Sequence, residues 1–396
     1  MKFFSFTGQQ GKLAGQLGAL AVLTIMLGFA ATTGLHAATA FPVTKTVGVG
    51  AGPDGIAVGP SGTYVYVTDN TDNNVSIIQV SNDKVVNLTV GNGPDAVAIN
   101  PTLGMVYVAD SSDGNVTVIN AATNKQVTNI TVGTTPDAIA VNPSTGDVYV
   151  VNNGDNTVSV IDGSTNKVTA TVPVGNAPDA VAVNPTTGNW YVADSSDNNV
   201  TVLSSTNTQV KNVTVGNNPV AIAVNAINNT VYVADENDNN VTLIQGSNNK
   251  ATANMTVGNS PDAIAVNSAT GTVYVADSSD ANVTVLSSVN KQLANVTVGS
   301  TPDAVAVDAT SGLVFVANFD ENSVSMIQGP KAAVVETTTS SSSTTSASET
   351  TSSSSSSTTA STSVPEFPVQ LGIAAVVTAF IVVAYAFARR ATARKQ

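Results

Sequence analysis

Aspartates at regular spacing are the residues of this chain that could carry chemistry. Seven prolines recur every 41 or 42 residues, and six of them are followed by an aspartate. These aspartates are Asp54, Asp95, Asp137, Asp179, Asp262 and Asp303. Carboxylate oxygens in rigid loops suit hard cations. The pattern therefore allows a Ca²⁺ or Mg²⁺ site as one hypothesis, and it indicates no other cofactor.

A structural role is the favoured alternative for these aspartates. Asp and Asn in tight turns hydrogen-bond the backbone and tolerate unusual φ angles, which alone explains their recurrence in every repeat. Their spacing also matches no complete ligand loop such as an EF-hand. The fifth repeat departs from the pattern, because Val220 follows its proline.

The composition argues against an enzyme. The chain contains no cysteine, and its single histidine, His36, lies near the N-terminus. The commonest general base is therefore missing from the repeats, and no phosphate-cradling glycine loop is present. Paired aspartates could act as acid and base, but near-copies of the same pair in most repeats indicate structure instead.

The repeat that carries these aspartates predicts the architecture. It holds four short runs of alternating apolar residues, which in the third repeat are residues 138–142, 147–151, 157–161 and 168–174. Such alternation between turn residues predicts antiparallel strands, and a repeated four-stranded unit is typical of a propeller blade. We therefore expect an all-β, seven-bladed β-propeller over residues 41–330, with a β-solenoid as the less favoured alternative.

The two ends of the repeat array predict how the ring closes. Residues 43–50 match the fourth strand of other repeats, and the array ends with a third strand at residues 323–327. The N-terminal strand should therefore complete the last blade and remove a free sheet edge. Residues 332–336 are a weaker match for the same place.

The same strand order predicts a polarised disc. The aspartates that follow the prolines and those after strand two should emerge on one face. The lysines between strands three and four should emerge on the other: Lys84, Lys125, Lys167, Lys250 and Lys291. Residues 41–330 carry a net charge of −17 and no arginine, which disfavours nucleic-acid binding.

Aromatic residues are expected to pack in the core. A tyrosine recurs in strand two of most repeats, and aromatics at such a repeated strand position usually pack. Trp190, the only tryptophan, replaces a valine found there in other repeats. Packing is the favoured role for Trp190 too, with stacking on a sugar ring as the alternative.

Eleven Asn-x-Ser/Thr sequons predict N-glycosylation of several sites if the chain is exported. Most recur at the start of strand three or in the middle of strand four, which should be accessible at the rim. They are Asn74, Asn87, Asn115, Asn129, Asn199, Asn212, Asn228, Asn240, Asn254, Asn282 and Asn295. The alternative is that Asn-Val-Thr is merely good turn-then-strand chemistry.

The flanking segments predict export and anchoring. Residues 1–40 contain two lysines, an apolar run and an Ala-x-Ala end, as in a signal peptide, with an uncleaved anchor as the alternative. Residues 331–368 hold a Ser/Thr-rich disordered stalk,. Residues 369–388 are largely apolar and uncharged, long enough for a transmembrane helix,. The basic residues 389–396 then place the tail in the cytoplasm.

The strand-two motif resembles the YVTN family of β-propeller repeats. It stands as Tyr66-Val-Thr-Asp69, Tyr107-Val-Ala-Asp110 and Tyr149-Val-Val-Asn152, beside the phrase Pro136-Asp-Ala-Ile-Ala-Val-Asn-Pro143. That family includes archaeal and bacterial cell-surface and surface-layer-associated proteins. The resemblance implies a surface propeller and no particular activity. The ending after Val364-Pro-Glu-Phe-Pro368 also looks like the tails processed by archaeal sortase-like transpeptidases.

Together these features predict a monomeric propeller, anchored at the cell surface by a C-terminal helix, that acts in recognition, adhesion or envelope structure. Its expected partner is a protein or glycan of the cell envelope, bound on the acidic face or in the channel mouth. The alternative is a propeller enzyme or cofactor-binding protein that uses carboxylates at the channel mouth. A passive spacer in the envelope is a third, weaker hypothesis.

Overall fold

The structure is a computed structural model, and it describes residues 41–331. The predicted signal peptide, the stalk beyond residue 331, the transmembrane helix, the basic tail and the competing strand at 332–336 lie outside the described residues. Within residues 41–331, no helix is both long and apolar enough to cross a bilayer.

The described residues form seven four-stranded antiparallel sheets, which confirms the predicted all-β propeller. Blade 1 contains β2 (Pro53–Val58), β3 (Tyr64–Asp69), β4 (Asn74–Gln79) and β5 (Lys84–Thr89). Blade 2 contains β6 (Pro94–Asn100), β7 (Met105–Asp110), β8 (Asn115–Asn120) and β9 (Lys125–Thr131). Blade 3 contains β10 (Pro136–Val141), β11 (Asp147–Asn152), β12 (Thr157–Asp162) and β13 (Lys167–Pro173). Blade 4 contains β14 (Pro178–Val183), β15 (Trp190–Asp194), β16 (Asn199–Leu203) and β17 (Gln209–Thr214).

The remaining blades follow the same plan. Blade 5 contains β18 (Pro219–Asn225), β19 (Thr230–Asp235), β20 (Asn240–Gln245) and β21 (Lys250–Thr256). Blade 6 contains β22 (Pro261–Val266), β23 (Val273–Asp277), β24 (Asn282–Leu286) and β25 (Gln292–Thr297). Blade 7 contains β26 (Pro302–Val307), β27 (Leu313–Asn318), β28 (Ser323–Gln328) and β1 (Val43–Gly48).

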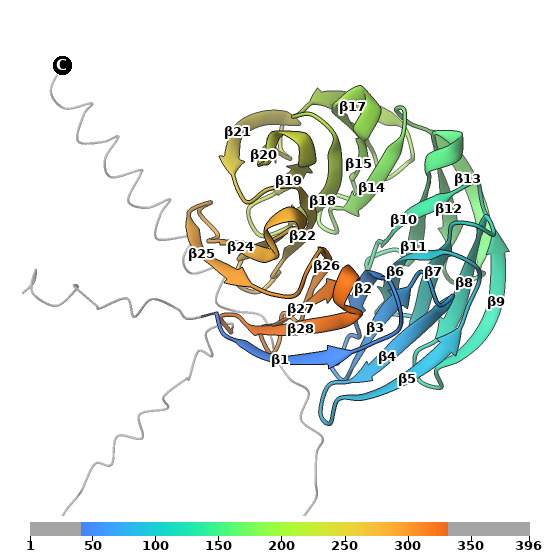
Figure 1. Cartoon of the computed structure of the whole chain (residues 1–396). Coiled ribbons are helices and arrows are strands. Elements are labelled where there is room, and N and C mark those ends of the chain that lie inside the picture. Colours follow the sequence, from blue (N-terminus) through green and yellow to red (C-terminus); the bar gives the residue numbers. More distant parts are fainter. Residues whose placement is uncertain (1–40, 332–396) are drawn as a thin grey trace, which may run out of the picture. The chain divides into compact units, whose positions relative to one another are not determined.

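The first strands of the blades form a closed inner circle. Each of them lies beside the first strands of the two neighbouring blades, and β26 lies beside β2 (Figure 1). The second, third and fourth strands follow outward in order. The first strand therefore lines the central channel and the fourth lies at the rim, as predicted.

The N-terminal strand closes the ring, which confirms the prediction. β1 pairs antiparallel with β28, and Val47 lies opposite Val324. The backbone N–H of Gln328 donates to the carbonyl of Pro42 at 3.0 Å. Phe41 is buried and packs edge-on against Tyr274, with 6.5 Å between the ring centroids.

Two details of the elements differ from the prediction. In the third repeat β10 starts at Pro136 rather than residue 138, because the strand contains a β-bulge between Pro136 and Ala138. Single 3₁₀ turns, which alternation cannot reveal, also follow the second strand in the last five blades. They are η1 (Asn153–Asp155), η2 (Ser195–Asp197), η3 (Glu236–Asp238), η4 (Ser278–Asp280) and η5 (Phe319–Glu321).

The strand-two aromatics pack in the core, as predicted. The tyrosines and Phe315 are almost fully buried. Several hydroxyls also reach the following blade, as where Tyr232 donates to Asn290 Oδ1 at 2.7 Å. Trp190 is fully buried, and its ring centroid lies 4.8 Å from that of Tyr149. Its Nε1 donates a hydrogen bond to the carbonyl of Ser204. Trp190 is thus a packing residue, and the sugar-stacking alternative is wrong.

Closure makes the stability of the ring sensitive to β1. We expect Val47→Asp to lower the free energy of unfolding by about 3–5 kcal/mol, because it places a carboxylate against apolar neighbours. Val47 is 7% exposed and packs with Ile56, Val65 and Val324. Urea titration followed by tryptophan fluorescence measures the change.

The matched control is Thr46→Asp, one residue earlier in β1, where the side chain is exposed. It should cost less than about 1 kcal/mol. Equal loss of stability in both variants would contradict the closing role of the buried face of β1.

Candidate functional site

The predicted aspartates lie at one end of the channel, on the inner strands. Each is the second residue of its strand, not part of the preceding loop. In every inner strand the register shifts by one residue just after the proline, as between Pro94 and Ala96. The extra residue of this bulge is Asp95 in blade 2 and its counterpart in other blades. A bulge re-aims side chains, and in six of the seven blades it turns one carboxylate toward its neighbours around the channel.

Blade 5 lacks the aspartate, and a different residue takes its place. Val220 occupies the bulge of β18. Glu236, in the turn after β19, instead interacts electrostatically with both Asp179 of blade 4 and Asp262 of blade 6. Its Oε2 accepts a hydrogen bond from Asn218 Nδ2 at 2.5 Å. Glu236 therefore bridges the gap left by Val220.

Glu236 was not among the predicted site residues, although the sequence holds a signal for it. The residue after the strand-two motif is Asn, Ser or Phe in the other repeats, and it is acidic only in the repeat that lost the aspartate. We call the resulting set the acidic ring. It comprises Asp54, Asp95, Asp137, Asp179, Glu236, Asp262 and Asp303.

Burial raises the pKa of every aspartate in the acidic ring, and neighbouring charges add to the effect at several of them. Burial raises the pKa of Asp54 to about 8, and the charges of Asp95, Asp303 and Asp137 add to the effect. The pKa of Asp303 rises to about 7 through burial and the charges of Asp262 and Asp320. Closely spaced carboxylates cannot all ionise. The ring therefore holds protons near neutral pH.

Asp95 and Asp137 interact directly within the ring. Their side chains hydrogen-bond to each other, which requires a proton on one of them. Burial is the main cause that raises the pKa of both carboxyls. Asn70 donates to Asp95 Oδ1, and Asn153 donates to Asp179 Oδ1 at 2.6 Å. In blades 1 and 3 the asparagine after strand two thus orients the ring carboxylate of the following blade.

The ring does not resemble a chelating site for one ion. Within residues 41–331, no three His, Cys, Asp or Glu side chains come close enough to share a metal ion. Ca²⁺ usually takes six to eight oxygen ligands around one point, whereas these carboxylates are distributed around a channel. Ca²⁺ or Mg²⁺ binding by the six predicted aspartates stays a prediction.

A second set of acids on the same face has a structural role. Asp72 Oδ2 accepts the backbone N–H of Ala51 at 2.8 Å, and Asp113 Oδ2 accepts that of Asn92 at 2.9 Å. The same clamp between the two loops of one blade recurs in every blade. Its remaining members are Asp155, Asp197, Asp238, Asp280 and Glu321. The backbone-capping interpretation is therefore confirmed for these residues.

Buried carboxylates end the second strand in five blades. Asp194 is fully buried. Its carboxylate accepts hydrogen bonds from the backbone N–H of Gly175 at 3.0 Å and from the hydroxyl of Thr201 at 2.6 Å. A Cβ on Gly175 would lie 2.4 Å from the Asp194 carboxyl carbon, so only glycine fits there. Burial raises the pKa of Asp194 to about 6. The equivalent residues are Asp69, Asp110, Asp235 and Asp277.

Ten of the eleven sequons fall into two structural groups. Those of strand four have exposed asparagines, and their Oδ1 faces the strand-three hydroxyl, as with Asn129 and Thr117 at 3.3 Å. This group is Asn87, Asn129, Asn212, Asn254 and Asn295. Those that start strand three are half-buried, with a buried Oδ1 that lacks a partner within the described part of the chain. This group is Asn74, Asn115, Asn199, Asn240 and Asn282.

Comparison with solved structures agrees with the class that the fold defines, a seven-bladed β-propeller. A hydrazine synthase of Kuenenia stuttgartiensis matches with a TM-score of 0.64 and 19% identity, over 75% of this chain and 98% of that chain. A virginiamycin B lyase of Staphylococcus aureus matches with a TM-score of 0.63 and 15% identity, over 72% and 98%. At such identities the likeness concerns the fold alone.

No family model and no curated protein matches the chain. The YVTN resemblance therefore stays a prediction beyond the propeller fold itself.

The raised pKa values predict that the propeller is more stable at mildly acidic than at alkaline pH. A carboxyl whose folded pKa exceeds its ordinary value of 3.8 stabilises the fold below pH 3.8, and this contribution is lost as pH rises through the folded pKa,. The folded pKa is about 6 for Asp194, about 7 for Asp303 and about 8 for Asp54. The melting temperature should therefore fall between about pH 5 and pH 9, measured by calorimetry.

The acids that clamp the two loops of each blade affect the stability in the opposite sense, and they do so at lower pH. Hydrogen bonds from Asn92 hold the pKa of Asp113 below its usual range, so its contribution is lost as pH falls below about 3.8. Maximum stability is expected near pH 4–6. Asp54→Asn combined with Asp303→Asn should flatten the alkaline decline. A melting temperature that rises toward pH 9 would refute the assignment.

Proposed function

We propose that this chain is a cell-surface recognition propeller, without catalytic activity, whose acidic ring binds a cationic group of an envelope protein or glycan. The single observation that carries the proposal is the closed circle of acids at one end of the channel, completed by Glu236 where Val220 interrupts it. The replacement favours a role for the ring itself, because Glu236 lies on a different strand connection from the aspartates.

The chemistry of the ring favours cationic ligands. An ammonium or guanidinium group can displace the protons that the crowded carboxylates hold and replace their repulsion by attraction. The acids of the surrounding loops add to the negative potential at the channel mouth. A partner with clustered lysines or arginines would thus associate quickly and in one orientation.

Recognition is favoured over catalysis by the sameness of the blades. The ring carboxylates are near-copies in similar surroundings, whereas a catalytic acid and base need pKa values that are set apart. Residues 41–331 contain no histidine and no cysteine that could supply another reactive group. The proposal holds the protein to be a monomer, because ring closure already pairs the edge of blade 7 with β1.

The proposed surface location is supported by the sequence at both ends. The buried anchor residue Phe41 follows directly after the predicted cleavage site, so the mature chain would begin where the propeller begins. The apolar segment 369–388 and the arginines after it would hold the chain in the membrane,. Protease treatment of intact cells, with detection of the released propeller, tests this location.

Binding of a short oligolysine peptide to the full chain tests the ring. We expect Asp54→Asn, Asp137→Asn and Asp303→Asn together to weaken binding about tenfold or more, which is about 1.4 kcal/mol. Affinity should also fall with salt. Binding should release protons, seen in calorimetry as a heat that depends on the ionisation enthalpy of the buffer.

The matched control neutralises three aspartates at the other end of the blades, Asp83, Asp147 and Asp162, each changed to Asn. It removes the same number of carboxyl groups and should change the affinity by less than about twofold. Equal weakening by both triple variants would show that only net charge matters, and the ring would lose its role.

Glycans are proposed at the strand-four sequons but not at those that start strand three. In strand four the Oδ1 is turned inward and Nδ2 donates to no partner within residues 41–331, which leaves it free for modification. Asn228 is also exposed, though its Nδ2 donates to the Ser288 carbonyl at 3.5 Å. Glycopeptide mass spectrometry of the native protein should find Asn129 modified and Asn115 bare. The reverse pattern would contradict the proposal.

A further inference from the structure

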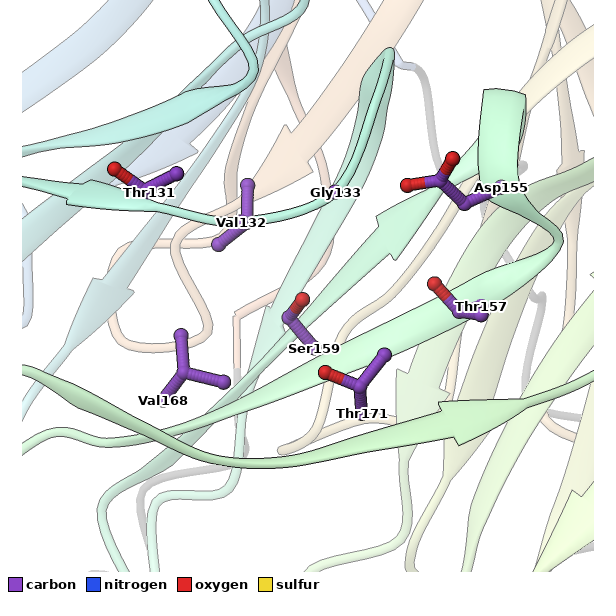
Figure 2. A pocket seen from close by; sticks show the side chains of 8 residues that line it. All are labelled: Thr131, Val132, Gly133, Asp155, Thr157, Ser159, Val168 and Thr171. Carbon is purple, nitrogen blue, oxygen red and sulfur yellow. The ribbon is translucent and has the colours of Figure 1, made fainter.

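A groove opens on the outer strands of blade 3, away from the acidic ring. It is a cavity of about 390 Å³ beside β12 and β13 (Figure 2). Hydroxyl groups of Thr131, Thr157, Ser159 and Thr171 and the carboxylate of Asp155 line it. Ser159 is buried, whereas Thr171 and Asp155 are exposed. The groove is therefore open to solvent and polar at its base.

The groove lies where blade 3 departs from the side-chain set of five other blades. In blade 2 the corresponding places hold Asp110, Asn115, Thr117 and Asn129. Blade 3 has Asn152, Thr157, Ser159 and Thr171 instead. Thr171 is shorter than asparagine, and it pairs with Ser159 as Asn129 pairs with Thr117. The space that the asparagine amide fills in blade 2 is open in blade 3.

The same departure reverses the direction of the hydrogen bonds at the base of the groove. In blade 2 the hydroxyl of Thr117 donates its proton to Asp110 Oδ2 at 2.7 Å. In blade 3 the amide Nδ2 of Asn152 donates to both Thr157 Oγ1 and Ser159 Oγ at 3.0 Å. A hydroxyl that accepts in this way keeps its own proton to donate. Blade 3 thus presents two oriented hydroxyl donors to the groove.

The rest of the lining offers one carboxylate acceptor and an apolar surface. Asp155 accepts two hydrogen bonds from Thr134, at 2.7 and 2.6 Å, and a carboxylate has lone pairs left for further donors,. Val132 and Val168 contribute methyl groups to the same cavity. Donors, one carboxylate and a few methyl groups suit a ligand that carries hydroxyls on a ring of C–H groups.

We propose that the blade 3 groove binds one neutral monosaccharide unit of a glycan. Ligand hydroxyls would accept from Ser159 and Thr157 and donate to Asp155, while the C–H face lies on the valines. The volume is within the range of small-ligand sites, about 300–1,000 Å³. Asp155 and the acidic body of the propeller disfavour anionic sugars. The site is separate from the acidic ring and does not depend on the function proposed for it.

The test uses the full chain made in a host that does not glycosylate, so that its own sugars cannot occupy the groove. Saturation-transfer NMR and calorimetry are run with glucose, galactose, mannose and N-acetylglucosamine, and with glucuronate as the anionic counterpart. At least one neutral sugar should bind with a Kd on the order of 1 mM. Thr171→Asn, which restores the side chain of five other blades, should weaken binding about tenfold or more.

The matched control is Thr46→Asn, the same change at the equivalent place in blade 7, opposite Ser325. It should leave the affinity unchanged within about twofold. Ser159→Ala, which removes one donor from the groove, should also weaken binding and serves as the second variant if Thr171→Asn does not fold. The proposal is overturned if no neutral sugar binds, if both groove variants bind as the unchanged chain does, or if glucuronate binds as tightly as the neutral sugars.

Discussion

Pairing of β1 with β28 is the interaction on which the rest of the structure depends. A propeller blade contacts only its neighbours, so the inner strands come together around a channel only when the last blade is joined to the first. β1 supplies that join by contributing a strand from the N-terminal end to the blade at the C-terminal end. Phe41 and Val47 bury apolar surface at this seam. Every property of the channel mouth follows from closure.

Closure creates an electrostatic conflict that the fold resolves in a specific way. The bulge after each inner-strand proline directs one carboxylate to the channel mouth, and circular repetition brings these carboxylates together. Two features reduce the repulsion between these carboxylates. Neighbouring carboxyls share protons, as Asp95 and Asp137 do, and amide groups such as that of Asn153 donate hydrogen bonds to them. Glu236 keeps the circle acidic at the blade that lacks the aspartate. The ring carboxylates lower the stability of the fold at neutral pH, and yet Glu236 completes the ring. This combination favours a binding role for the ring.

Departures from the repeat are where the blades acquire individual chemistry. Five blades share a buried aspartate, a donating hydroxyl and an asparagine on strand four, and this set is structural. Blade 3 has Asn152 in place of the aspartate and Thr171 in place of the asparagine, and it keeps the hydroxyl as Ser159, which now accepts a hydrogen bond. The groove lies at these residues. Blade 7 makes a similar exchange, with Asn318 donating to Ser323 and Ser325. Because these residues change together, the blades differ in the direction of a set of hydrogen bonds and not at a single residue.

The sequence alone determined the fold, because the signals that reveal it are local patterns. These signals are the period of the repeat, the alternation of apolar residues within it and the match of residues 43–50 to a fourth strand. Six of the seven ring acids were also visible, since each follows a proline. Glu236 and the groove of blade 3 were decided by tertiary structure. Glu236 reaches its neighbours only because three blades meet at the channel. The groove arises from side chains on three different strands, whose hydrogen bonds reverse direction when Asn152 replaces aspartate. Spacing along a chain carries neither kind of information.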